Sequence, residues 1–183
     1  MPVSLGLMGR RLSILIVVVF AVVGLAACDS SSPSSSPPKP RDPEPLARLF
    51  CNRRAHGEIG TSLGVAPEHV TEGRLARHVY SCRYVFPDGA IALSVRGFPD
   101  AAAAKRSFRA LETRLGHRPE HPMLGEGLDA FLTTDGSMIV RKGPDVLDVD
   151  VTGLPSPFGA PPQARSVVAL AVAVTIIGHW EPG

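Results

Sequence analysis

The sequence has almost no net charge, with 19 Lys and Arg residues against 17 Asp and Glu residues. The positive excess comes from Arg10 and Arg11, so the rest of the chain has 17 residues of each sign. Proteins that attract nucleic acid or anionic membranes by charge have an excess of basic residues. The balance therefore argues against nucleic acid, and against anionic lipid held by charge alone, as a partner.

Short motifs for common reactions are also scarce. We identify no Gly-x-Ser-x-Gly nucleophile elbow, and Gly125-Glu126-Gly127 lacks the further glycines and the lysine of a phosphate-binding loop. The six histidines have no evident catalytic partner in the sequence. Because active sites assemble in space, these absences make an enzyme the least favoured function without excluding one.

One pair of histidines has a spacing that metal sites use. His117 and His121 are four residues apart, with Glu120 between them. On a helix, two imidazoles at this spacing share a face and can bind one metal ion. Pro119 and Pro122 oppose a helix here, and no third ligand is evident. An exposed loop is the preferred interpretation.

Four carboxylates, Asp135, Asp145, Asp148 and Asp150, gather around the last two predicted hairpins. Carboxylates that converge from loops bind calcium, and paired carboxylates can perform acid–base catalysis. Asp148 and Asp150 instead alternate with apolar residues along one strand, which is the pattern of a solvated sheet face. We therefore predict no metal site, no cofactor and no catalytic residue.

What the sequence does contain begins with an export signal over residues 1–27. Arg10 and Arg11 form a short basic region, and residues 12–24 form an apolar stretch. The alternative is a membrane-spanning helix, which needs about 20 apolar residues. Residues 12–27 fall short of that length, and no cluster of Lys or Arg follows them. A cleaved signal is therefore preferred.

The segment Leu25-Ala26-Ala27-Cys28 at the end of this stretch resembles the lipobox of bacterial lipoproteins. The resemblance implies that the Cys28 thiol receives a diacylglyceryl group and that cleavage makes Cys28 the first residue of the mature chain. We expect a lipid anchor at Cys28. The alternatives are an ordinary cleaved signal and an uncleaved anchor.

Residues 28–45 are predicted to form a tether, and residues 46–183 a single α+β extracytoplasmic domain. From residue 29 to residue 40 the tether has no apolar residue other than proline. Such a composition buries too little surface to offset the entropy of ordering it. The remaining length is enough for one domain with a true core.

Cys51 and Cys82 are the cysteines that remain once Cys28 is acylated. An even pair in an exported, oxidising compartment predicts a disulfide between the first helix and the first strand. It would close a loop of roughly 30 residues and add about 3 kcal/mol of stability. The alternative is two unpaired buried thiols, and two sulfurs alone are too few for a metal site.

Periodicity in the domain predicts three helices and five strands. Helices are expected over residues 46–64, weakened at Gly57 and Gly60, over 100–115 between Asp100 and Gly116, and over 163–180. Strands are expected over 80–86, 90–98, 128–134, 137–142 and 146–152, joined by hairpin turns. Residues 65–78 are predicted to be a loop or a short helix.

The order helix, two strands, helix, three strands, helix predicts an antiparallel sheet of about five strands with one face covered by helices. The apolar run 167–177 is too short to span a bilayer and is interpreted as a buried helix, with a strand as the alternative. Basic residues on the 100–115 helix are interpreted as a solvated face rather than a docking surface. They are Lys105, Arg106, Arg109 and Arg114.

Taken together, these segments resemble small actinobacterial lipoproteins with an exported domain of unknown function. The likeness includes the lipobox, the Ser/Pro tether, the two domain cysteines, and the segments 100–104, 125–130 and 138–143. In that group Gly-Leu-Gly is commoner than the Gly-Glu-Gly-Leu found at 125–128. The resemblance implies an envelope-surface domain with no established catalytic residues to carry over.

We therefore expect a lipoprotein held on the extracytoplasmic face of the cell membrane by a lipid on Cys28. Its domain would present a non-catalytic binding surface to an envelope protein, a glycan or a lipid. The alternative is a carrier of an apolar ligand, such as a lipid or glycolipid, in a cavity between the sheet and its helices. An envelope enzyme is less favoured than either.

Overall fold

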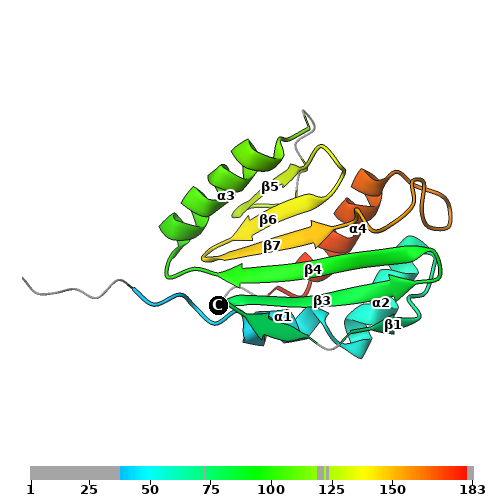
Figure 1. The fold of residues 1–183 in the computed structure, drawn as a ribbon, viewed down its shortest axis with the longest axis horizontal. Coiled ribbons are helices and arrows are strands. Elements are labelled where there is room, and N and C mark those ends of the chain that lie inside the picture. The colour runs from blue at the N-terminus through cyan, green and yellow to red at the C-terminus, as the bar shows by residue number, and fades with distance from the viewer. Residues whose placement is uncertain (1–37, 72, 119–121, 123, 181–183) are drawn as a thin grey trace, which may run out of the picture. The chain divides into compact units, whose positions relative to one another are not determined.

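An antiparallel sheet forms the centre of the described part of the chain, residues 38–71, 73–118, 122 and 124–180 of a computed structural model. Its strands are β1 (His69–Val70), β2 (Arg74–Ala76), β3 (Val79–Phe86), β4 (Gly89–Gly97), β5 (Leu128–Leu132), β6 (Met138–Lys142) and β7 (Asp145–Asp150). Their spatial order is β1–β3–β4–β7–β6–β5, and β2 also pairs with β3 (Figure 1). The predicted signal, the lipobox and Cys28 lie outside the described residues.

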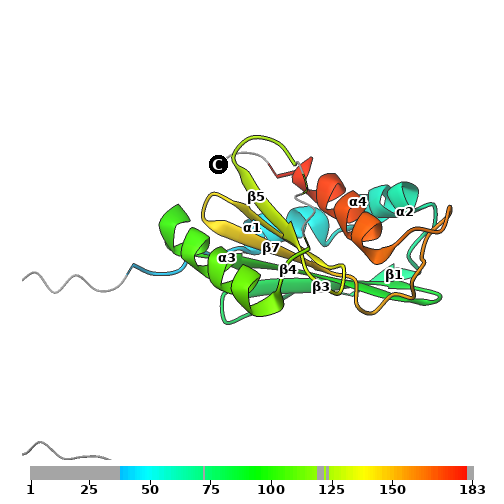
Figure 2. The same ribbon diagram turned by 90° about the horizontal axis from the view of Figure 1, so that it is seen from above.

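Four helices pack on the sheet: α1 (Glu44–Phe50), α2 (Arg53–Leu63), α3 (Ala101–Leu115) and α4 (Arg165–Ile177). Figure 2 shows α3 on one side of the sheet, and α1, α2 and α4 on the other. The α+β class is therefore confirmed. The last apolar segment is a helix, as preferred, with Val168, Val172 and Ile176 buried.

The clearest sequence signals produce the elements that they predict. Val79 to Phe86 pairs with Gly89 to Arg96 across the Pro87-Asp88 turn. Helix α3 begins where the Asp100 carboxylate accepts a hydrogen bond from the Ala103 amide at 2.7 Å, and it ends at Gly116 with φ of 67°. These features depend on a few neighbouring residues, so the sequence displays them directly.

The first helical segment is interrupted at Cys51-Asn52 and not at Gly57 or Gly60. The side-chain oxygen of Asn52 accepts hydrogen bonds from the backbone amides of Arg54 and Ala55 at 2.8 and 3.0 Å, and these bonds cap α2. The side-chain amide nitrogen of Asn52 also donates a hydrogen bond to the backbone carbonyl of Leu49 at 2.8 Å. One side chain thus ends α1 and begins α2. Helix α1 starts at Glu44, inside the segment predicted as tether.

The sheet has seven strands rather than five, because residues 65–78 contain two short strands. That segment was predicted to be a loop or short helix, which was wrong for β1 and β2. Strand β1 has two residues and β2 has three, too few to display an alternating pattern. Both are defined by their antiparallel pairing with β3.

Helices cover both faces of the sheet, which corrects the prediction of a single covered face. The larger core lies under α1, α2 and α4 and includes Tyr84, Leu93 and Leu147. The smaller core lies under α3, where the rings of Phe108 and Phe131 meet edge to face with centroids 5.1 Å apart. The face predicted to be solvated along β7 is the one that α3 partly covers.

The first helix is joined to the sheet by covalent and polar contacts. Cys51 forms the predicted disulfide with Cys82 on β3, with Cα atoms 5.9 Å apart. Nearby, the hydroxyl of the buried Tyr84 donates a hydrogen bond to the carbonyl of Phe50. Burial raises the pKa of Tyr84, so its hydroxyl remains a donor at any physiological pH.

Candidate binding site beneath helix α3

A cavity of about 330 Å³ lies between α3 and the sheet. It exists because α3 packs over β6 and β7 and leaves the same face of β3 and β4 uncovered. The sheet lines it with Val79, Ser94, Arg96, Val146 and Asp148, and the helix side with Phe98, Ser107, Ala110, Leu111 and Arg114. Ligand pockets span roughly 300–1,000 Å³, so this volume suits a small ligand.

Strand alternation decides which β4 side chains reach the cavity. Ile91, Leu93 and Val95 are fully buried in the larger core. Ser94 and Arg96 therefore point to the opposite face, beside α3. The small side chains of Ser94 on the sheet and Ala110 on the helix both line the cavity and leave space that larger residues would fill.

Two arginines of the cavity are available to a ligand. Arg96 and Arg114 are both exposed, and within the described ranges neither has a hydrogen-bond or ion-pair partner. A guanidinium group presents a planar set of donors that matches carboxylate or phosphate oxygens. The two arginines can therefore bind an anionic group.

Asp148 contributes to the same cavity a carboxyl group whose pKa is raised. Its pKa rises from 3.8 to about 6, first because burial disfavours the charged form, and then because Asp150 and Asp135 repel it. Its side chain has no hydrogen-bond partner among the described residues. The carboxylate can accept a hydrogen bond from a ligand hydroxyl or amine. Asp148 is half-buried beneath α3, whereas the sequence predicted a solvated position.

The other three predicted carboxylates serve the local structure. Asp150 accepts hydrogen bonds from the Thr152 amide and hydroxyl at 2.8 and 2.6 Å. Burial would raise the pKa of Asp135, but hydrogen bonds from Thr133 and Ser137 prevail and hold it below the usual value. No group of three metal-ligating side chains occurs in the parts of the chain that the structure describes.

Asp145 lies at the start of β7 and is buried. Burial raises its pKa, and the nearby Arg41 opposes that rise, with guanidinium and carboxylate atoms 3.9 Å apart. Of the predicted histidine pair, His117 is exposed just after α3, while His121 and the intervening Glu120 lie outside the described residues. That pair is not placed by the structure.

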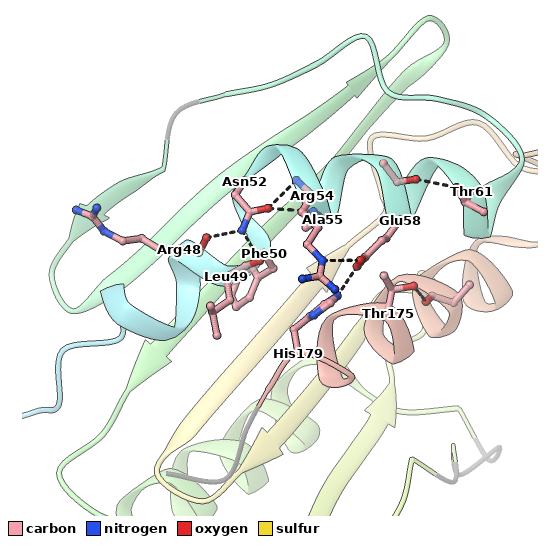
Figure 3. Close-up of polar contacts among 12 residues, drawn as sticks. Arg48, Leu49, Phe50, Asn52, Arg54, Ala55, Glu58, Thr61, Thr175 and His179 are labelled. Carbon is pink, nitrogen blue, oxygen red and sulfur yellow. Dashed lines mark hydrogen bonds and ion pairs between the residues drawn. The ribbon is translucent and has the colours of Figure 1, made fainter.

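A second, wide groove of about 570 Å³ lies between α2 and α4. In Figure 3 the Glu58 carboxylate lies between Arg54 and His179, and it contacts both. The hydrogen bonds from His179 and then Arg54 lower the pKa of Glu58. These contacts fasten the segment after α4 to α2.

Hydroxyl groups of this groove are engaged by their own helices. The pattern Gly-x-Ser-x-Gly, not identified from the sequence, does occur at residues 60–64. It ends a helix instead of forming a strand-to-helix turn, and the Ser62 hydroxyl donates to the Ile59 carbonyl at 2.9 Å. Thr61 and Thr175 likewise donate to helix carbonyls at 2.9 Å. The groove has a His–Glu pair without an activated nucleophile.

Comparison with known proteins leaves the family resemblance a prediction. No protein family, curated protein or solved structure matches this chain. Over the described ranges, every helix is too short or too polar to cross a membrane. The geometry beneath α3 therefore carries the functional argument for the domain.

Proposed function

We propose that this chain is an extracytoplasmic lipoprotein, acylated at Cys28, whose folded domain binds a small polar ligand in the cavity beneath α3. The observation that carries the ligand proposal is the set of unpaired charges in that cavity. Arg96 and Arg114 can hold an anionic group, while Asp148 accepts a hydrogen bond from another part of the ligand.

Binding fits the cavity better than catalysis does. Its lining contains serine, arginine, aspartate and apolar residues, with no histidine or cysteine. Asp148 would be the sole acid or base, and neither Ser94 nor Ser107 has a hydrogen bond that would activate it as a nucleophile among the described residues. We therefore propose a non-catalytic domain.

A carrier of a wholly apolar ligand fits less well. Such a ligand would leave two guanidinium groups and a carboxylate without partners in the occupied site. A lipid or glycan fragment with an anionic or hydroxyl-bearing head satisfies the same groups. The ligand classes expected from the sequence are thus narrowed to those with a polar end.

The anchor proposal rests on the sequence. Leu25-Ala26-Ala27-Cys28 follows an apolar stretch, and a segment with no apolar residue other than proline follows it from residue 29 to residue 40. We expect Cys28→Ser to abolish acylation and release the protein from membranes. The intact mass and the detergent partitioning of both chains measure this, and an unchanged partitioning of the variant contradicts the anchor.

Native mass spectrometry of the detergent-extracted lipoprotein tests the ligand. A bound mass should accompany the wild type and disappear in Ala110→Trp, whose indole fills the cavity. The matched control is Ala102→Trp, an exposed position on the same helix outside the cavity lining. Equal occupancy in all three proteins, or no bound mass in any, contradicts the proposed site.

A further inference from the structure

We propose that the domain docks on anionic phospholipid through a surface beside the point where the tether reaches the sheet. This surface, the hairpin patch, consists of Arg74, Leu75, Arg77, His78 and Arg96. The inference rests on the lipid anchor of the proposed function, and it adds an orientation of the domain on the membrane.

The patch lies at one end of β3 and β4. Strand β2 pairs with Val79 to Ser81, and the β2–β3 turn is formed by Arg77 and His78. A cavity of about 360 Å³ connects this turn to the tether, since Pro40 lines it together with Arg77, His78 and Arg96. The patch thus lies at the end of the domain that the chain reaches at Pro40.

Its positive charges are not neutralised within the domain. Arg74, Arg77 and Arg96 are exposed, and none has an ion-pair partner in the described part of the chain. Some other arginines do have such partners, whereas Arg53, Arg83 and Arg106 also lack one among the described residues. Arg54 pairs with Glu58, Arg109 with Glu112, and Arg141 with Asp129. The overall charge balance therefore conceals a local basic surface.

Asp145 and Asp148, described acidic residues near the patch, do not neutralise its charge. Asp145, at the start of β7, is buried and faces Arg41 of the tether. Asp148 lies in the cavity beneath α3, which shares Arg96 with the patch, but no ion pair joins the two. The outer surface of the patch thus presents guanidinium groups to a neighbouring anionic surface.

An exposed apolar side chain accompanies the arginines. Leu75 is 43% exposed and follows Arg74 on the edge strand β2. It pairs with Tyr80, so its side chain points to the sheet face opposite to that of Arg74 and Arg96. Apolar residues flanked by basic ones enter the boundary between lipid headgroups and acyl chains, while the basic groups bind phosphates. The lipid anchor, which keeps this hairpin edge close to a bilayer, favours a lipid surface over a soluble acidic peptide.

The backbone of the turn has a conformation that is unfavourable for Arg77 and His78. Arg77 and His78 have φ of 50° and 62°, in the left-handed region that two-residue hairpin turns require. Asn-Gly meets this requirement with least strain. The sequence instead places two long polar side chains at the hairpin tip, where they are fully available to a partner.

Because the proposed anchor holds the chain at the membrane, weak contacts between the patch and the lipids are sufficient for docking. Pro40 is 12 positions after Cys28 in the sequence. Even a fully extended chain of that length reaches only roughly 40 Å, so the patch remains close to the bilayer. Each basic residue at an anionic surface favours the bound state by about fivefold, and three arginines together by about a hundredfold.

Amide hydrogen exchange of the acylated full chain in lipid nanodiscs tests the docking. One set of discs contains phosphatidylcholine with about one third phosphatidylglycerol, and the other contains phosphatidylcholine alone. We expect exchange in residues 73–79 to slow by about tenfold in the anionic discs only. The double variant Arg74→Glu/Arg77→Glu should lose this protection. The charge-matched control Arg53→Glu/Arg83→Glu, at exposed positions outside the patch, should keep it.

The outcomes separate this inference from the anchor. A mature chain whose intact mass shows no acyl group overturns the proposed anchor and the docking with it. An acylated chain with equal exchange in both kinds of disc overturns the docking alone. Protection by soluble polyglutamate but not by anionic discs assigns the patch to an acidic protein and also overturns it. Loss of protection in the control variant shows that the patch is not specific.

Discussion

The two faces of the sheet are built from the same strands but differ in how completely they are covered. Beneath α1, α2 and α4, side chains from β3, β4, β6 and β7 are almost all apolar, and Tyr84, Leu93 and Leu147 are fully buried. Beneath α3, the apolar contact is confined to a small cluster around Phe108. The same face of β3 and β4 presents serines and arginines instead.

This difference indicates how the domain divides stability from function. The larger core involves three helices and supplies most of the buried apolar surface, which is the main favourable contribution to folding. The α3 face can then leave a cavity and an unpaired carboxylate at Asp148 without loss of the fold. The proposed ligand site and its charged residues, Arg96, Arg114 and Asp148, lie where packing is least complete.

The largest expected effect comes from a charge in the larger core. Leu147→Asp places a carboxylate at a fully buried position, which costs several kcal/mol out of a total stability of about 5–15 kcal/mol. We expect the variant to be unfolded by circular dichroism. Ser81→Asp, exposed on the uncovered face, is the control, with a change of about 0.5 kcal/mol or less. Equal melting temperatures would remove the distinction between the faces.

The disulfide should have the next largest effect, since it joins the helical layer to the larger core. Cys51 and Cys82 are 31 residues apart, a loop for which the chain-entropy model gives about 3–4 kcal/mol. Chemical denaturation of the wild type with and without reductant measures the loss. The double variant Cys51→Ser/Cys82→Ser should not respond to reductant. A wild type equally stable after reduction contradicts the prediction.

Truncation under α3 tests the smaller core directly. Phe108→Ala removes a ring that is 3% exposed, and such changes cost about 3 kcal/mol at the lower end of their range. We expect that lower end because the neighbouring cavity lets the site relax. Urea denaturation measures the loss of unfolding free energy, with Arg106→Ala on the exposed side of α3 as the control. A loss larger than that of Leu93→Ala would reverse the ranking of the two faces.

A smaller, pH-dependent effect is expected at Asp148. Its folded-state pKa of about 6 exceeds the ordinary 3.8, so the folded protein binds a proton more tightly than the unfolded chain. The contribution of Asp148 to stability is therefore most favourable below pH 3.8, falls as the pH rises through 6, and stays lower above it. Asp148→Asn should raise stability at pH 7 by roughly 1–2 kcal/mol and have little effect at pH 3.5. Denaturation midpoints across pH measure it, and an equal gain at both pH values contradicts the assignment.

The smallest effect is expected on the outer side of α3. Arg109 pairs with Glu112 at 3.3 Å, but the arginine side chain is 66% exposed. Exposed pairs of this kind contribute about 0–1 kcal/mol, so Arg109→Ala should shift the melting temperature only slightly. Glu112→Ala provides the matched change of the other partner. A large loss from either would show that this side of α3 is packed against something else.

Local signals explain the part of the fold that could be predicted. Asp100 and Gly116 bound α3 through contacts with their own neighbours, and Pro87-Asp88 turns one strand into the next. The break at Cys51-Asn52 was missed because Gly57 and Gly60 have lower helix propensity. An asparagine that caps one helix and ends another has no periodic signature, and β1 and β2 are too short to have one.

The candidate site was harder to predict from the sequence than the secondary structure was. Asp148 alternates with Leu147 and Val149 as a solvated residue would, and the sequence does not show which helix lies over it. Arg96 and Arg114 are 18 residues apart, on a strand and a helix, and only packing brings them to one cavity.

By itself, the sequence determined the α+β class, the hairpins, the boundaries of α3 and the pairing of Cys51 with Cys82. Each depends on residue chemistry acting over a few positions or on the count of available partners. Tertiary structure alone decided that α3 lies on the face opposite to the other helices, that Asp148 is shielded, and that the β2–β3 turn lies beside Pro40. These features depend on how distant surfaces pack, and alternation along a strand identifies two faces without showing what covers either.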